Sequence, residues 1–466
     1  MKSKLVFILL ILVFLSTTGL GCKQGNLAAY KELSEPITLK YWRVFDGDDT
    51  FSDIIASYRQ THPNINIEYK KLRYEEYEQA LLEAWAEDRG PDMLTIHNTW
   101  VKKYQDRLTP MPESIRLPYV SEADSRTGKM TKADYKQTKA FTPMDVKNKF
   151  ADVVYQDVVK EDKIFGLPLS VDSLALFYNR TLFDNAQITK PPATWIEVKE
   201  AVKKLTIKDE TGKIVQAGIA LGTSNNINRA GDVLSLLMMQ NGAEMVDVSG
   251  GRALFHEESS YASKNSSGES FRPGVEALNF YTSFASPIKD VYTWNDELPE
   301  AAEAFVAGKA AMMLGYAYQL PLIRTQGSRL NIGVIEVPHI NLNGTDSLGS
   351  KINIASYWVE TVAKKTQYEN YAWDFLMFAT SAEQAEKYLN KTKKPTALRS
   401  LVDKQANDYE IAPFANQVLT AKSWYRGRDP QAAEQIFKDM INNVVSGKTE
   451  PQEAANFAAN KINQTF

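Results

Sequence analysis

The 466-residue chain has little sulfur and little imidazole, with one cysteine, Cys22, and four histidines. A single cysteine excludes an internal disulfide and a metal site built from several cysteines. None of the histidines has the sequence spacing of zinc ligands; they are His62, His97, His256 and His339. The chain also lacks the short motifs of nucleophile elbows, phosphate-binding loops and zinc proteases, so motifs indicate no enzyme class.

Neither sign of charge dominates, because 54 lysines and arginines face 57 aspartates and glutamates, for a formal net charge of −3. This balance gives no sign of a nucleic-acid partner or a polybasic membrane patch. Beyond the N-terminus, no apolar run is long enough to span a bilayer. With 44% hydrophobic and 24% charged residues, the composition is that of a folded protein, and the length predicts two domains.

The N-terminus is the exception to this pattern. Two lysines, Lys2 and Lys4, precede an apolar stretch from Leu5 to Leu15, and small residues follow. A basic start, a short apolar middle and a small-residue exit predict a signal peptide over residues 1–21. An uncleaved N-terminal membrane anchor is the alternative, but the stretch is short for a stable span.

Cys22 follows the signal peptide directly and resembles the lipidated cysteine of a bacterial lipobox. Gly21 fits that pattern, whereas Leu20 stands where a small residue is expected and Gly19 where leucine is usual. We expect lipidation of Cys22, with residues 22–36 as a polar, lipid-anchored linker, since acyl chains hold a protein at a membrane by burying CH₂ groups. The alternative is a secreted protein with a free thiol.

The folded part begins with an alternation of strand and helix patterns. "ITLKYWRVF", from Ile37, alternates like a strand, and helical spacing follows in "TFSDIIASYRQ" before a second strand from Ile65. A helix and a short strand, separated by "GPD", repeat the order. This order predicts an α/β fold with a parallel sheet covered by helices on both faces. Two polar stretches, 109–162 and 249–270, are interpreted as surface segments, and the first is interpreted as an insertion without a function of its own.

Five stretches stand in the order of one known family. They are "ITLKYW", "GPDMLTIHNTW", "IFGLPLSVDSLALFYNRTLFDNAQITKPPATWIEV", "AFVAGKAAMMLGYAY" and "AWDFLMFATSAEQAEKYLNKTKKPT". With them, the chain from about Ile37 to Ile462 resembles the bacterial extracellular solute-binding proteins of family 1, the maltose-binding-protein-like, sugar-binding branch. The third stretch is the most specific, with Gly-x-Pro at a crossover, then Tyr-Asn, then Pro-Pro-x-Thr-Trp at the start of a helix.

The resemblance implies the two-lobe, type II periplasmic-binding-protein-like fold, with discontinuous lobes and a ligand cleft between them. The implied boundaries are 37–167 plus 335–378 for lobe one and 172–332 plus 381–466 for lobe two. The hinge segments would lie near 168–171, 333–334 and 379–380.

Asp172 interrupts the apolar run of "KIFGLPLSVDSLALFYNR". A carboxylate in a buried strand costs stability unless something pairs with it. The resemblance places it where the chain crosses between lobes, and it implies that Asp172 accepts hydrogen bonds from ligand hydroxyls. An ion pair with a nearby arginine or lysine is the alternative.

A saccharide also needs apolar walls, because the C–H faces of its rings pack on aromatic side chains. The resemblance puts several aromatic residues in cleft loops: Trp100, Tyr316, Tyr318, Tyr357, Trp358 and Trp424. Four other tryptophans occupy strand or helix faces and are expected in the core: Trp42, Trp85, Trp195 and Trp373. The expected polar partners of a ligand are His97, Asn98, Asp46 and Arg229, with Asp232 beside Arg229.

The resemblance therefore implies a binding protein without a cofactor and without chemistry, most simply a monomer. It would capture a saccharide between its lobes and present it to the permease of an ABC transporter, from an extracytoplasmic, membrane-anchored position. Two alternatives stay open at this point. One is the same fold with a polyamine, a phosphate ester or a metal ion as ligand, and the other is an extracellular carbohydrate-active enzyme.

Overall fold

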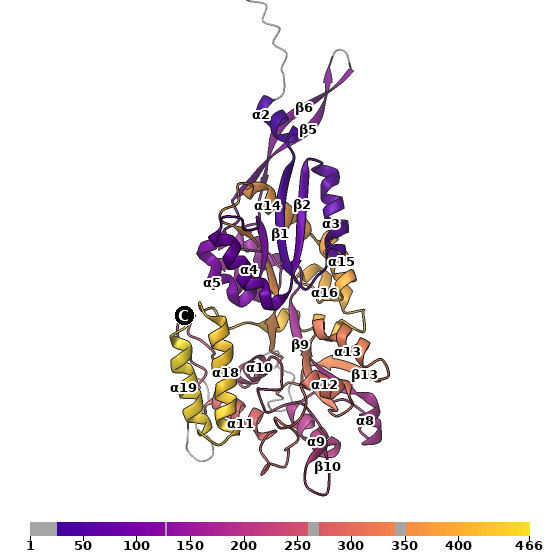
Figure 1. Ribbon diagram of the computed structural model, residues 1–466, viewed down its shortest axis with the longest axis vertical. Coiled ribbons are helices and arrows are strands. Elements are labelled where there is room, and N and C mark those ends of the chain that lie inside the picture. The colour runs from indigo at the N-terminus through magenta and orange to yellow at the C-terminus, as the bar shows by residue number, and fades with distance from the viewer. Residues whose placement is uncertain (1–25, 126–127, 260–269, 341–350) are drawn as a thin grey trace, which may run out of the picture.

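A computed structural model describes residues 26–125, 128–259, 270–340 and 351–466. The chain forms two α/β lobes along the long axis of the molecule, with a narrow arm beyond lobe one (Figure 1). Each lobe has its own hydrophobic core. Within the described ranges, every helix is too short or too polar to cross a bilayer.

Lobe one is built on a five-stranded sheet of order β2-β1-β3-β15-β4. Its strands are β1 (Ile37–Val44), β2 (Ile65–Leu72), β3 (Met93–His97), β4 (Leu108–Thr109) and β15 (Trp358–Ala363). β1 pairs in parallel with β2 and β3, as the strand–helix order predicts, whereas β15 is antiparallel to β3. The lobe's helices are α3 (Asp48–Thr61), α4 (Tyr74–Ala86), α5 (Val101–Tyr104), α6 (Pro143–Lys149), α7 (Asp152–Val158), α14 (Glu369–Ala379), α15 (Ala382–Thr392) and α16 (Arg399–Gln405).

Lobe two surrounds β9 (Asp172–Asn179), every residue of which is buried. The sheet order is β12-β9-β14-β16, with β13 also paired to β9, and the other strands are β12 (Met312–Tyr316), β13 (Ile332–Glu336), β14 (Asn353–Ser356) and β16 (Ala421–Lys422). The small pair β10 (Ile207–Lys208) and β11 (Ile214–Gln216) lies at the end farthest from the arm (Figure 1). The helices are α8 (Arg180–Asn185), α9 (Trp195–Leu205), α10 (Ala230–Gln240), α11 (Pro273–Ser283), α12 (Ala301–Val306), α13 (Leu320–Gln326), α17 (Ala412–Ala415), α18 (Pro430–Val445) and α19 (Pro451–Asn463).

The segments in which the chain crosses between the lobes meet at β9, β14 and β16, which pair in one sheet. Ser356 of β14 pairs with Asp172 of β9, and Asn353 of β14 pairs with Ala421 of β16. Gly166 lies just before the first crossing, where a Cβ atom would stand 2.8 Å from the carbonyl oxygen of Glu360. Glycine is therefore needed for the close approach of this segment to β15.

Two of the boundaries implied by the resemblance do not match the packing. Val337 and Ile354, placed in lobe one, belong to the core of lobe two, because β13 pairs with β9. Conversely, Ala385, Tyr388 and Leu389 of α15, placed in lobe two, pack in the core of lobe one, where α15 lies against α3. An amphipathic helix next to a hinge can cover either lobe, so its own pattern does not choose between them.

The arm consists of a long hairpin and a helix. Its strands are β5 (Ser114–Ser125) and β6 (Gly128–Lys139), and α2 (Leu27–Ser34) packs on both of them. Residues 22–36 were expected to be a linker, and this is wrong for 27–34, where Ala29 is fully buried. The stretch 109–162 is also more than a surface insertion, since Val146 of α6 and Val154 of α7 are buried in the core of lobe one. The helices in this stretch are short and the strands of the hairpin alternate weakly between apolar and polar residues. The sequence pattern therefore did not reveal these elements.

Several other predictions concern burial. Trp85, Trp195 and Trp373 are buried, as expected, while Trp42 is only partly buried, beneath the ammonium group of Lys70. Within the stretch 249–270, Phe255 is fully buried in lobe two, so that part is not a surface loop. Residues 260–269, the signal peptide and Cys22 lie outside the described residues.

Candidate functional site

A pocket lies between the two lobes. Lobe one contributes Tyr74, His97, Thr99 and Trp100 to its lining. Lobe two contributes Arg229, Asp232, Ser235, Glu434, Phe437 and Gln431, and the crossing segments contribute Ile354, Ala355, Ser423 and Trp424. Five of the residues singled out from the sequence thus line one cavity, namely His97, Trp100, Arg229, Asp232 and Trp424.

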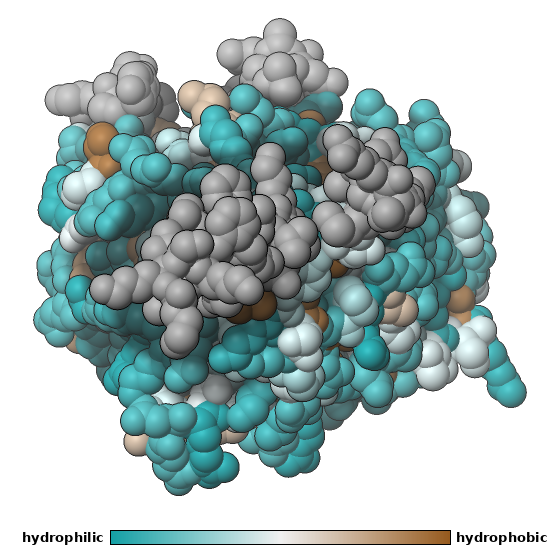
Figure 2. Space-filling model, turned by 90° about the horizontal axis from the view of Figure 1, so that it is seen from above, coloured by the Kyte–Doolittle hydropathy of each residue, from teal (hydrophilic) through white to brown (hydrophobic). Residues whose placement is uncertain are grey.

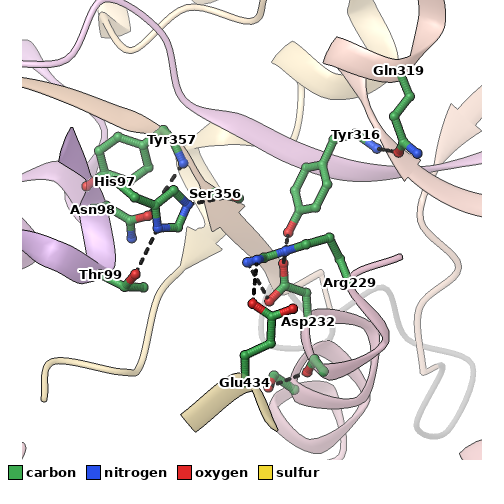
Figure 3. A network of polar contacts seen from close by, with 12 residues as sticks. His97, Asn98, Thr99, Arg229, Asp232, Tyr316, Gln319, Ser356, Tyr357 and Glu434 are labelled. Atoms are coloured by element: carbon green, nitrogen blue, oxygen red, sulfur yellow. Dashed lines mark hydrogen bonds and ion pairs between the residues drawn. The ribbon is translucent and has the colours of Figure 1, made fainter. Parts of the chain in front are cut away.

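Arg229 holds two carboxylates in the lobe-two wall (Figure 3). Its Nε donates to Asp232 Oδ2 at 2.8 Å and its Nη2 to Asp232 Oδ1 at 3.2 Å, while its Nη1 donates to Glu434 Oε2 at 3.2 Å. Burial lowers the pKa of Arg229, but Asp232 and Glu434 outweigh it and raise the pKa above its ordinary value. The guanidinium therefore stays charged and links the start of α10 to α18.

The backbone of Arg229 is in the left-handed region, with φ 63° and ψ 31°, immediately before α10. This conformation costs a residue with a Cβ atom about 1 kcal/mol or more, and it persists where the surroundings hold it. Here the bidentate contact with Asp232 holds it. Backbone strain at a pocket wall supports a functional role for this side chain.

Tyr316 supports the same cluster. Its hydroxyl donates to Asp232 Oδ2 at 2.7 Å, and its ring is only 1% exposed (Figure 3). Burial, and then the charge of Asp232, raise the pKa of Tyr316, so the hydroxyl keeps its proton. Tyr318 stacks on it with ring centroids 6.0 Å apart and is half exposed. Neither tyrosine lines the pocket, so their expected stacking on a ligand stays a prediction.

His97 faces this cluster from lobe one, at the end of β3. Its Nδ1 lies 2.8 Å from Thr99 Oγ1 and its Nε2 lies 3.1 Å from Ser356 Oγ. Burial, helped by the charge of Arg229, lowers the pKa of His97 to about 3. The ring is therefore neutral near pH 7, with one donor and one acceptor nitrogen held between two hydroxyls.

Aromatic rings form the apolar part of both walls. Trp100 packs edge-on against Trp358 with centroids 5.8 Å apart, and Trp358 lies behind the lining rather than in it. On the other side, Trp424 donates from Nε1 to Ser235 Oγ at 3.0 Å and packs on Phe437.

One aromatic residue of the lining and another that packs on it were missed in the sequence. Tyr74 lines the pocket, and Phe45 stacks on it with centroids 5.8 Å apart. Phe45 is half exposed and, like Arg229, has left-handed backbone, with φ 66°. A bulky residue in that region is uncommon, but a single sequence does not reveal backbone angles.

Asn98 does not point a free amide into the pocket. Its Nδ2 donates to Asp157 Oδ2 at 3.0 Å, and its backbone N–H donates to the carbonyl of Tyr357. Asp157 also accepts from Tyr357 Oη at 2.9 Å and from Ser423 Oγ at 2.5 Å, and it pairs with Arg426. Asp157 thus connects the segment after β3 to the end of β14 and to the segment after β16, where the chain last crosses between the lobes. The sequence pattern of α7 does not mark this residue as buried.

Asp46 is also committed within the protein. Its carboxylate is 3.1 Å from Arg43 Nη1 and 2.6 Å from Lys394 Nζ, and it accepts from Tyr388 Oη at 2.8 Å. Burial raises the pKa of Asp46, but Arg43 and Lys394 outweigh it and lower the pKa. The local cations contact both oxygens and Asp46 lies outside the pocket lining, so its expected contact with a ligand stays a prediction.

Among the described residues, Asp172 forms no ion pair with an arginine or lysine, and backbone N–H groups contact its carboxylate instead. Its Oδ1 accepts from the backbone N–H groups of Ser173 at 2.8 Å and Ala317 at 3.0 Å, and its Oδ2 accepts from that of Tyr318 at 3.2 Å. Burial raises its pKa to about 7, against the lowering effect of these three bonds. Asp172 lies outside the pocket lining, and the donors expected from a ligand come from the chain's own backbone.

The two lobes touch at the rim of the pocket. Gln431 of α18 donates to Glu78 Oε2 at 2.9 Å and accepts from Lys103 Nζ at 3.1 Å. Within the described ranges, no three histidine, cysteine, aspartate or glutamate side chains gather as a metal site. Aromatic walls flanking charged acceptors and donors are suited to a polyhydroxylated ring, whose faces are apolar and whose edges form hydrogen bonds.

Comparisons with known proteins agree on the class of fold. The family described as bacterial extracellular solute-binding protein matches residues 45–386. The chain is 23% identical to the galactooligosaccharide-binding protein of Bacillus subtilis over 97% of this chain and 95% of that one. It is 21% identical to the multiple sugar-binding protein of Streptococcus mutans, over 91% and 90%. Among solved structures, the cyclic alpha-maltosyl-1,6-maltose binding protein of Arthrobacter globiformis has a TM-score of 0.70 at 17% identity, over 92% of this chain and 99% of that chain.

Proposed function

Because the chain belongs to the family of bacterial extracellular solute-binding proteins, we propose that it captures a carbohydrate in the pocket between its lobes. The observation that supports this most is the composition of the pocket, where Trp100 and Trp424 face a charged cluster around Arg229. The names of the two relatives above support the same class of ligand.

The charges of the pocket favour a neutral saccharide. Arg229 already pairs with two carboxylates, Asp232 and Glu434, so the cluster has no excess positive charge for a phosphate or a carboxylate ligand. The neutral ring of His97 adds none. Sugar hydroxyls can donate to the remaining lone pairs of the carboxylates and accept from the guanidinium, and such charged hydrogen bonds are strong in a dry site.

Binding would be coupled to closure of the lobes. Hydrogen bonds at the rim, from Gln431 to Glu78 and from Lys103 to Gln431, join the two lobes in the conformation described here. A sugar that contacts both walls favours this closed arrangement, and closure excludes water from the polar contacts. Closure would rotate one lobe relative to the other, and the crossing strands, which pair in one sheet, would bend to allow this rotation.

The proposed partner is the permease of an ABC transporter, which would recognise the closed form of the protein. The protein would catalyse no reaction and would act as a monomer. A lipid on Cys22 would keep it on the outer side of a bacterial membrane and raise its concentration near the permease.

A thermal-shift screen tests the carbohydrate proposal, because a ligand that binds only the folded protein raises its melting temperature. The mature chain is screened against mono- and oligosaccharides, inorganic phosphate, spermidine and ferric ion, and positives are measured by calorimetry. We expect at least one saccharide to raise the melting temperature, and to do so less in Trp424→Ala. A shift with phosphate, spermidine or ferric ion and with no saccharide would contradict the proposal, and release of sugar products would make the protein an enzyme.

A further inference from the structure

The folded part of the chain begins on the arm. The backbone N–H of Asn26 donates to the carbonyl of Ala133 at 3.0 Å, and Tyr30 Oη donates to the carbonyl of Thr131 at 2.6 Å. Tyr135 Oη donates to Glu32 Oε2 at 2.8 Å. These bonds fix α2 to β6, so the first described residues and the hairpin are one unit (Figure 1).

The arm is firmly joined to lobe one. Ile115 and Leu117 of β5 are buried in the lobe's core. Tyr371 of α14 donates to Glu32 Oε1 at 2.7 Å, on the same carboxylate that accepts from Tyr135. The arm therefore cannot swing freely, and whatever holds its outer part orients the whole lobe.

The outer part of the arm exposes aliphatic and aromatic side chains. Leu27 is 77% exposed, Val120 is 55%, Tyr119 is 39% and Tyr30 is 37%. Val120 pairs with Ala133 and Tyr119 with Asp134, next to the points where α2 is bonded to β6, and as neighbours on one strand these two side chains point to opposite faces of the hairpin. Figure 2, seen from this end, shows a largely hydrophilic surface with hydrophobic residues placed singly. Such a surface is suited to the headgroup region of a membrane rather than to an apolar groove of a partner protein.

Only three residues separate Cys22 from Asn26 in the sequence. Four residue steps of extended chain span at most about 14 Å. A lipid on Cys22, as proposed above, would therefore bring the start of α2 and the arm to the surface of the bilayer. The linker between Cys22 and the arm is short, because α2 begins at Leu27 and its first turn is bonded to the hairpin.

We propose that α2 and the neighbouring part of the β5–β6 arm lie on the phospholipid surface, with Leu27, Tyr30 and Val120 in the headgroup interface. Tyrosine, with an apolar ring and a polar tip, is favoured at that level of a membrane, and small aliphatic contacts add to it. The arm thereby holds the lobes in a fixed orientation above the membrane. The inference rests on the lipid anchor of the proposed function but not on the nature of its ligand.

Position-specific labelling tests the contact. Once Cys22 is lipidated through its sulfur, a cysteine introduced by Val120→Cys is the only free thiol, and nitrobenzoxadiazole is attached to it. Val215→Cys is the matched control, since Val215 is a valine of similar exposure, 48%, on β11 at the far end of lobe two. Both lipidated proteins are placed in vesicles of phosphatidylethanolamine and phosphatidylglycerol, without any permease.

We expect a blue shift of the label at position 120, with quenching by spin-labelled lipids at least twofold stronger than at position 215. Adding Leu27→Ser should reduce that quenching while saccharide affinity stays unchanged. A lipidated chain whose label at 120 is as exposed as at 215 overturns the arm contact alone. A mass spectrum with unmodified Cys22 overturns the anchor and the arm contact together, while binding of a saccharide stands apart from both.

Discussion

The backbone N–H of Tyr318 donates to Asp172 across a gap of 146 residues, at 3.2 Å, next to a bond from Ala317 to the same carboxylate at 3.0 Å. These bonds attach the segment after β12 to the first residue of β9, where the chain crosses between the lobes. Asp172 thus stabilises the fold at the point where the chain crosses between the lobes.

Replacing Asp172 should therefore change stability rather than binding. Asp172→Ala leaves three backbone N–H groups without an acceptor, at about 1–3 kcal/mol each, so we expect the free energy of unfolding to fall by about 3 kcal/mol or more. Chemical denaturation measures this, and calorimetry below the transition should give the wild-type saccharide affinity. Asp184→Ala, an exposed aspartate of α8, is the control and should change neither quantity. A large loss of affinity at unchanged stability would return Asp172 to the ligand site.

The sequence could give the parts of this relationship that are local. Alternation of apolar and polar residues in 37–44 predicts β1 correctly, and the buried run after Gly166 predicts β9. The partner of Asp172 is a backbone segment far along the chain, and no side-chain pattern marks it. Asp157 was missed for the same reason, since all of its donors except Arg426 are neutral groups on other elements. Trp100 and Arg229 line the pocket as expected, but that expectation came from the family resemblance, which places their segments at the cleft, and not from their local sequence pattern.

His97 should make stability depend on pH. In the folded chain its pKa is about 3, whereas an unfolded histidine titrates near 6.5, so between these values the unfolded chain binds one more proton. The free energy of unfolding should therefore decrease as the pH falls below about 6.5. Between pH 7 and pH 5, urea unfolding of His97→Asn should lose about 1–2 kcal/mol less than wild type. Equal losses in both proteins would mean that the imidazole is protonated in the folded pocket.

Arg229 allows its side chain to be separated from its backbone strain. Glycine adopts left-handed backbone without penalty, so Arg229→Gly removes the guanidinium and relieves φ at once. We expect saccharide affinity to weaken by about 2–3 kcal/mol, because a charged hydrogen-bond donor is lost and Asp232 and Glu434 then repel each other. Arg252→Gly, which removes an exposed arginine paired with Glu257, is the control and should bind normally. Wild-type affinity in Arg229→Gly would place the ligand elsewhere.

Asp157 should act as the anchor of the last crossing. Asp157→Ala removes the acceptor of Asn98, Tyr357 and Ser423 and leaves Arg426 without its ion pair, so we expect a loss of about 3–5 kcal/mol in the free energy of unfolding. The control is Asp152→Ala on the same helix, whose exposed carboxylate pairs with Arg399 and should be worth about 1 kcal/mol or less. Similar losses in both variants would show that the buried cluster adds nothing beyond a surface pair.

Tryptophan fluorescence should report occupancy of the pocket. Trp100 lines it from lobe one and Trp424 from a crossing segment that packs on the core of lobe two, so a saccharide that closes the lobes should change the surroundings of both indoles. We expect the ligand-induced change in emission to shrink by at least a third in Trp100→Phe and in Trp424→Phe. Trp294→Phe, which removes a fully buried indole of the lobe-two core, should leave the ligand-induced change intact while lowering the total emission. If the response instead disappears in Trp294→Phe and persists in the other two variants, the signal comes from a rearrangement of lobe two, and the pocket between the lobes is not where the saccharide binds.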